Sequence, residues 1–289
     1  MARRTLKFGI LNIKTHPHSE EKYQQLFTKA ADLQRVAKIR GLDCGVIGFV
    51  RKSDGDSYLI GTALRFVNID PDKMWYDIVQ KKMIDPKKGK INVPQELKPH
   101  LRVNYFVFFP KTHRLIIDIS RFSPGSAEKL FDTILNSFEL QKEFGDVTVL
   151  VDQAIESITR IMKLQMKSKI FIRITRPNGD DLTEARAKMI SRLEDQNVKI
   201  YDETLSGGRG GNIKPDEDTK TMMKIARTDG YVVAIGRNAN DEHEEISTKK
   251  HPSVYTMHYN SDEEDYGEAL ENLANKVNDL CQRQIEDNL

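Results

Sequence analysis

The sequence predicts an α+β fold, with an N-terminal antiparallel sheet and flanking helices followed by a smaller α/β unit. Two observations predict it. The first 120 residues contain pairs of strand-like segments joined by short polar turns, which is the pattern of β-hairpins. After Gly145 the pattern changes to alternating strand-like and helix-like segments.

The N-terminal elements follow from apolar spacing. Leu6–Lys14 alternates apolar and polar residues and predicts a first strand. Ser19 is a helix N-cap residue, and apolar residues at helical spacing after it predict a helix that ends at Gly41. Cys44–Arg51 and Tyr58–Val67 form the first predicted hairpin, around a Ser-Asp-Gly-Asp turn.

A polar stretch separates the first hairpin from the second. Lys81–Arg102 holds seven lysines and arginines, two acidic residues and three prolines, and is expected to be a long loop. Arg102–Phe109 and Arg114–Ser120 then form the second predicted hairpin. Ser123 opens a predicted helix with apolar residues at helical spacing, which are Leu130, Phe131, Ile134, Leu135 and Phe138.

The second half predicts a smaller unit. Strands are expected at 147–151, 170–175, 198–201 and 231–236, and helices at 152–164, 182–193 and 215–227. In the last segment Tyr266, Leu270, Leu273, Val277 and Leu280 form a heptad-like stripe. Docking of this helix on the protein's own core is favoured over a coiled coil with a partner.

Composition limits the functional classes. No segment has the 18–20 consecutive apolar residues of a membrane span, and 30% of the residues are charged, so a soluble protein is expected. The two cysteines, Cys44 and Cys281, are too few for a disulfide framework or a thiolate zinc site, and indicate a reduced, cytoplasmic setting.

The charge is divided between the two halves of the chain. Residues 1–121 contain 23 Lys and Arg against 12 Asp and Glu, a net charge of +11, whereas the remainder has a net charge of −9. A basic half of this kind points to a polyanionic partner.

Basic residues on hairpins and on a long loop can neutralise phosphates without reading bases. We therefore predict one cationic surface for DNA, and we expect Tyr105, Phe106, Phe108 and Phe109 to offer stacking surfaces or to fill the core. The predicted nucleic-acid-binding residues are Arg51, Lys52, Lys81, Lys82, Lys87, Lys88, Lys90, Lys111, Arg114 and Arg209.

Arg209 lies in the glycine-rich string Ser206–Asn212. Its glycines would let backbone amides approach an anion, but the string is no P-loop because it lacks Gly-Lys-Ser/Thr. A mobile linker is the favoured interpretation.

No catalytic or metal-binding motif is present. His16 and His18 lack a third ligand in any recognised spacing, and no nucleophile motif occurs, so no cofactor, metal or catalytic residue is expected. Asp118, Asp152, Glu156, Asp180 and Asp181 would have to converge in space to form a nuclease, and nothing in their spacing requires it.

Two resemblances add to this interpretation. The layout of Val103–Phe109, Leu115-Ile116-Ile117 and Arg121-Phe122-Ser123-Pro124-Gly125 is similar to that of the RexA-like phage-exclusion proteins. The whole chain resembles a bacterial family of unknown function of about this length, through Pro177–Asp181, Lys214–Asp216 and Ser247–Pro252. The RexA-like proteins imply a DNA-gripping homodimer with a membrane channel protein as effector. They also imply a globular domain of residues 1–163 and 259–289, with residues 164–258 inserted as a smaller α/β domain.

The leading hypothesis is a non-enzymatic, dimeric and largely sequence-independent DNA-binding sensor of anti-phage defence or exclusion. A metal-dependent nuclease or nucleotide-processing effector is the enzymatic alternative. A protein–protein adaptor that associates through its opposite charges is the third.

Overall fold

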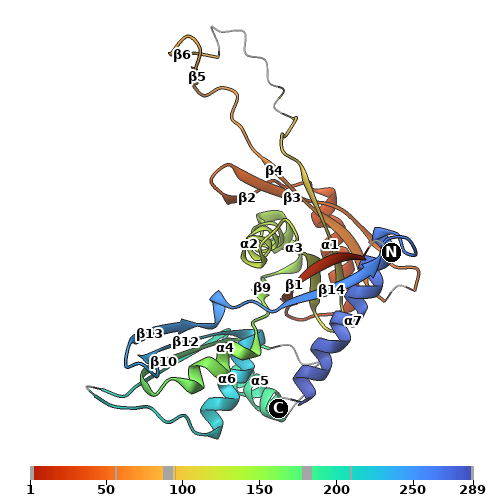
Figure 1. The fold of residues 1–289 in the computed structure, drawn as a ribbon. Helices are drawn as coiled ribbons and strands as arrows, with labels where there is room; N and C mark the ends of the chain where they lie inside the picture. The colour runs from red at the N-terminus through yellow and green to blue at the C-terminus, as the bar shows by residue number, and fades with distance from the viewer. Residues whose placement is uncertain are drawn as a thin grey trace.

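The computed structural model describes residues 3–55, 57–86, 94, 96–177, 184–208 and 210–287. The predicted α+β class is confirmed, with a curved antiparallel sheet at the N-terminal side (Figure 1). A second, smaller sheet with its own helices lies beside it.

The large sheet has eight strands in the order β14-β1-β8-β7-β4-β3-β2, and β9 pairs with the C-terminal half of β1. Every pairing in it is antiparallel, and hairpins join β3 to β4 and β7 to β8. The strands are β1 (Arg3–Thr15), β2 (Ala37–Arg40), β3 (Asp43–Lys52), β4 (Leu59–Val67), β7 (Arg102–Phe109), β8 (Arg114–Asp118), β9 (Val147–Val151) and β14 (Val254–Asn260).

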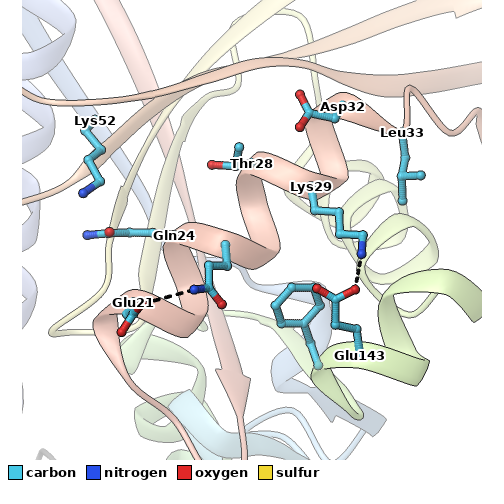
Figure 2. A pocket seen from close by; sticks show the side chains of 10 residues that line it. Glu21, Gln24, Thr28, Lys29, Asp32, Leu33, Lys52 and Glu143 are labelled. Carbon is cyan, nitrogen blue, oxygen red and sulfur yellow. Dashed lines mark hydrogen bonds and ion pairs between the residues drawn. The ribbon is translucent and has the colours of Figure 1, made fainter.

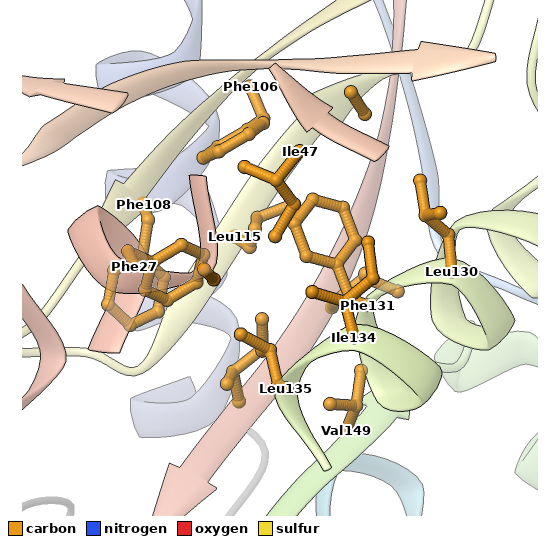
Figure 3. Close-up of a cluster of buried hydrophobic side chains, with 14 of the residues drawn as sticks. Phe27, Ile47, Phe106, Phe108, Leu115, Leu130, Phe131, Ile134, Leu135 and Val149 are labelled. Atoms are coloured by element: carbon orange, nitrogen blue, oxygen red, sulfur yellow. The ribbon is translucent and has the colours of Figure 1, made fainter. Parts of the chain in front are cut away.

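Three helices cover one face of this sheet: α1 (Glu20–Asp32), α2 (Pro124–Leu135) and α3 (Phe138–Phe144). The apolar face of each helix meets the sheet in one core, whose centre contains Phe27, Phe106, Phe108 and Phe131 (Figure 3). The Phe27 and Phe108 rings stack with centroids 4.5 Å apart. The core therefore contains the aromatic residues of β7 whose side chains point to this face.

The predicted end of the first helix is wrong. Ser19 caps α1 as expected, but the helix ends at Asp32, and the segment expected to continue it contains strand β2. Gln34 adopts a positive φ of 45° and its side-chain amide donates to the carbonyls of Ala31, Ile47 and Gly48. These hydrogen bonds stabilise a chain reversal that apolar spacing does not reveal.

Helix α7 (Tyr266–Asp287) covers the opposite face of the large sheet. Leu270, Leu273 and Val277 pack against Phe8 and other residues of β1, β7 and β8, which confirms that this part of the stripe docks on the protein's own core. Leu280 is 38% exposed, so its place in the buried stripe was predicted wrongly. Cys281 continues this contact, and both cysteines are buried and free.

The smaller sheet has the order β11-β10-β12-β13, and all its pairings are antiparallel. Its strands are β10 (Met166–Thr175), β11 (Ile200–Ser206), β12 (Gly230–Arg237) and β13 (His243–Ser247). Helices α4 (Ile155–Lys163), α5 (Glu184–Asp195) and α6 (Glu217–Asp229) pack on one of its faces around a second core of Ile, Leu, Val and Met residues.

Membership of the two cores shows to which sheet the segments near the ends of the smaller unit belong. Ile158 and Ile161 of α4 belong to the second core, although the expected division at residue 163 places them in the first unit. Strand β14, which begins at Val254, pairs with β1 of the large sheet. The segments from α4 to β13 therefore lie between β9 and β14 in the order of elements.

Candidate nucleic-acid interface

The predicted basic residues are divided between two distant places. Arg51 and Lys52 end β3, and Lys111 lies on the β7–β8 turn; all three are at the end of the sheet where Leu59 pairs with Phe108. Lys81 and Lys82 lie on an arm that leaves the opposite end, after Val67. The length of β4 separates these ends, which is about 26 Å at roughly 3.3 Å per residue.

The remaining predicted residues differ in exposure. Arg114 is 7% exposed and lies beneath α7, and its Nη1 atom has no hydrogen-bond partner among the described residues. Arg51 is exposed, with Nη2 3.3 Å from Glu271 Oε1. Lys87, Lys88, Lys90 and Arg209 lie outside the described residues.

The aromatic residues between these charges occupy the core rather than a binding surface. Phe106 and Phe108 are fully buried and Phe109 is 7% exposed. Tyr105 is half-buried against the ring of Tyr266. Of the two interpretations of this aromatic run, the structure supports core packing, because residues of β7 alternate between two faces that are both covered by helices.

The arm is the most prominent protrusion of the molecule (Figure 1). Within it, strands β5 (Trp75–Asp77) and β6 (Lys82–Ile84) pair in a short hairpin, where a loop was expected from Lys81 onward. Asp77 Oδ1 accepts from the backbone amides of Val79 and Gln80, so the tight turn at the tip is stabilised locally.

The tip of this arm combines apolar and cationic side chains. Ile78 is 79% exposed and Val79 is 89% exposed, and Lys81 and Lys82 follow them closely. Met83 and Tyr76, which pair across the hairpin, are also exposed. Sequence reasoning missed these apolar residues, although the segment Met74–Val79 is an apolar-rich run next to lysines.

Lys52 borders a shallow groove on the exposed side of α1 (Figure 2). The groove has a volume of about 690 Å³ and is also lined by Glu21, Asp32 and Glu143. Lys29 forms an ion pair with Glu143 there. Because the carboxylates of this lining outnumber its lysines, the groove does not form a phosphate site.

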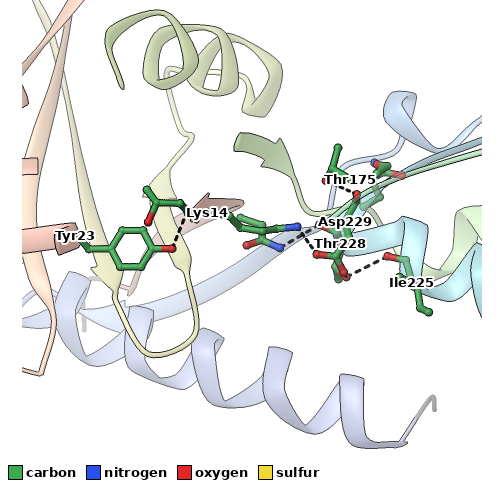
Figure 4. A network of polar contacts seen from close by, with 10 residues as sticks. Lys14, Tyr23, Thr175, Ile225, Thr228 and Asp229 are labelled. Carbon is green, nitrogen blue, oxygen red and sulfur yellow. Dashed lines mark hydrogen bonds and ion pairs between the residues drawn. The ribbon is translucent and has the colours of Figure 1, made fainter. Parts of the chain in front are cut away.

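A buried polar network joins the smaller unit to the large sheet (Figure 4). Lys14 of β1 and Asp229 of α6 form an ion pair whose side chains are 1% and 3% exposed. Asn12 donates to the carbonyl of Thr228 at 3.1 Å, and Gln153 donates to that of Gly230 at 2.5 Å. The C-terminal end of α6 is therefore held against β1 by specific contacts.

Two carboxylates of the nuclease hypothesis, Asp118 and Asp152, have structural partners, whereas Glu156 of α4 is exposed. Asp118 accepts from the Tyr266 hydroxyl at 2.7 Å, and burial together with this bond raises the pKa of Tyr266. Asp152 Oδ1 lies 3.5 Å from Arg227 Nη1. Asp180 and Asp181 lie outside the described residues.

Three further properties of the described residues bear on function: metal binding, the titration of a histidine and membrane crossing. No group of three or more His, Cys, Asp or Glu residues there has the geometry to hold a metal ion. Burial, with the charges of Arg176 and Lys14, lowers the pKa of His16 to about 4, so its imidazole is neutral at pH 7. None of the described helices is both long enough and apolar enough to cross a membrane.

Comparison with known proteins identifies a family but no activity. Residues 4–275 match a family described as a domain of unknown function (DUF4747). No curated protein matches the sequence.

Proposed function

The chain belongs to the DUF4747 family of unknown function, and we propose that it is a non-enzymatic, largely sequence-independent DNA-binding protein. In this proposal it acts as a cytoplasmic, dimeric sensor in anti-phage defence or exclusion. The defence role, the homodimer and a membrane channel protein as effector rest on the resemblance to the RexA-like proteins. DNA binding rests on the charge of the first half of the chain and on the arm.

The arm is the observation that supports DNA binding best. It places exposed Lys81 and Lys82 next to exposed Ile78 and Val79 at the end of a protrusion. Lysines on such a tip can contact phosphates on either side of a groove, and apolar side chains can insert between base steps of the minor groove. Contacts of this kind read no major-groove base edges, which fits binding that is largely independent of sequence.

The end of the sheet that carries Arg51, Lys52 and Lys111 supports DNA binding less strongly than the arm. Arg51 already interacts with Glu271, and Tyr58 donates to the same carboxylate at 3.1 Å. A phosphate there would have to displace or tolerate Glu271. On the arm Lys81 and Lys82 are exposed, and Asp70, Asp72, Asp77 and Asp85 lie on the same protrusion.

The test is fluorescence anisotropy of labelled duplex DNA with the full chain across a salt series, with Mg²⁺ present and strand integrity checked on a gel. K81E/K82E should weaken binding about tenfold or more and reduce the magnitude of the log–log salt slope by about 1.8, at roughly 0.9 per phosphate contact. I78S/V79S should weaken binding with an unchanged slope, because it removes no charge.

K142E/K163E is the matched control, because it makes the same change in charge at exposed lysines of α3 and α4. Equal weakening in both charge-reversal variants would contradict a role for the arm, and no duplex binding at low salt would overturn DNA binding. Cleaved strands would support the nuclease alternative. A mass by light scattering that falls with rising salt, without any effect of DNA, would support the adaptor.

A further inference from the structure

The smaller sheet has one face over which the structure places none of the described helices. Ile170, Ile172 and Ile174 of β10 point to the helices and are fully buried. The alternate residues of the same strand, among them Phe171 and Arg173, point to the other face and are only partly buried.

That face has an unusual composition for an open sheet. A solvated face of an antiparallel sheet normally carries polar residues. Here the central strand β12 presents Tyr231, Val233 and Ile235 in succession, all partly exposed. Phe171 of the neighbouring central strand pairs directly with Val233. Phe171 and the three residues of β12 therefore form a small apolar, aromatic surface on the face opposite the helices.

The two aromatic rings form one platform. The ring centroids of Phe171 and Tyr231 are 5.7 Å apart, and the rings are tilted by 44°. Arg173 pairs with Tyr231 in the register, with its guanidinium carbon 5.6 Å from the Phe171 centroid and 5.7 Å from the Tyr231 centroid. The guanidinium therefore lies over both rings, and a group of aromatic and guanidinium planes of this kind can stack on nucleobases.

Arg173 is held in this position by Asp202 of β11. Its Nε donates to Asp202 Oδ1 at 2.6 Å, and its Nη2 donates to Oδ2 at 2.5 Å. A bidentate pair fixes the plane of the guanidinium, so Arg173 serves as a stacking surface more than as a free phosphate ligand.

One cation lies over the platform and another beside it. Lys249 Nζ lies over the Tyr231 ring, 4.1 Å from its centroid, and Lys169, which is exposed, lies two residues from Phe171 on the same face. Asp202 and Glu245 also belong to this face, so its net charge is small. Such a surface favours a single strand, whose bases are free to stack on the rings and whose phosphates need only a few contacts with cations. It does not favour a duplex, in which the bases are already stacked on one another.

We propose that the helix-free face of the smaller sheet binds single-stranded nucleic acid, with bases stacked on Phe171 and Tyr231 and phosphates near Lys169 and Lys249. RNA-recognition modules use the same kind of surface, a four-stranded sheet whose exposed aromatic residues stack on bases. The inference extends the proposed function to a second surface, which lies on a different unit from the arm. Duplex binding by the arm and single-strand binding by this face can therefore be refuted separately.

The test is anisotropy with labelled dT10 and U10 oligonucleotides, measured on the full chain that carries K81E/K82E so that the arm contributes little. F171L/Y231L should weaken binding about 10- to 100-fold, because two stacking rings are lost while much of the apolar volume is kept. The salt slope should stay nearly unchanged, because no charge is removed. Thermal melts would confirm that both proteins are folded.

F138A is the matched control, because Phe138 of α3 is 76% exposed and lies away from this sheet. Retained binding in F138A together with weakened binding in F171L/Y231L supports the inference. Unchanged binding in F171L/Y231L, or no binding of either oligonucleotide, overturns it and leaves duplex binding by the arm untouched.

Discussion

Replacement of Lys14 by methionine is expected to destabilise the protein strongly. Lys14 and Asp229 form an ion pair whose side chains are 1% and 3% exposed, between β1 and the end of α6. K14M leaves the Asp229 carboxylate buried, where the Thr228 hydroxyl donates to Oδ2 at 2.8 Å without neutralising its charge. Removal of one partner of a buried pair costs about 3–5 kcal/mol of the free energy of unfolding.

The measurement is urea unfolding of the full chain, with thermal unfolding as a second readout. At about 2–3 °C per kcal/mol for a protein of this size, the melting temperature of K14M should fall by roughly 6–15 °C. K14M/D229L removes both charges and should recover most of this loss, since replacement of both partners by apolar residues is often close to neutral.

K199M is the control, because Lys199 forms a 2.6 Å ion pair with Asp146 in which the two side chains are 82% and 57% exposed. Loss of an exposed pair costs about 0–1 kcal/mol. If K14M and K199M lose similar free energy, or if K14M/D229L is less stable than K14M, the assigned role of the buried pair is wrong.

Two further predictions concern pH and packing. The pKa of His16 is lowered to about 4 in the folded protein, so the unfolded chain takes up a proton first as pH falls below about 6.5, and stability declines from there toward pH 4. The urea midpoint should fall less between pH 7 and pH 5 in H16N than in the unchanged protein. Equal falls in the two proteins would contradict this prediction. G61A should cost about 1–3 kcal/mol, because a Cβ there would meet the Phe106 ring and lie 2.6 Å from the Phe49 carbonyl oxygen. A Cβ added at Gly125 in α2 would meet nothing within 4 Å, so G125A should be neutral or raise the free energy of unfolding by up to about 1 kcal/mol. A similar loss of stability in G61A and G125A would refute the packing argument.

Local patterns predicted many elements of the fold. The alternation of Leu6–Lys14 and the hairpin turns predicted strands of the large sheet, and the stripe from Leu270 to Val277 predicted a helix docked on the core. These patterns succeed because the period of apolar residues reports which side of an element is buried. The first helix was predicted too long because Gln34 ends it through long-range hydrogen bonds to Ile47 and Gly48.

The candidate site was predicted less well. Arg114 and Lys111 are close in sequence, yet Arg114 is buried because α7, from the far end of the chain, returns to cover β8. Strand β4 runs from the turn beside Lys52 to the base of the arm that carries Lys82, so its length keeps the two lysines apart. The aromatic surface of Phe171 and Tyr231 also depends on the pairing of β10 with β12.

The sequence by itself determined the α+β class, the basic and acidic halves and the burial of the last helix's apolar stripe, because composition and periodicity are local properties. Only the tertiary structure decided which cations share a surface, which aromatic residues remain accessible, and that Lys14 is neutralised by Asp229. Those properties depend on contacts between residues far apart in the chain, which strand order and domain packing create.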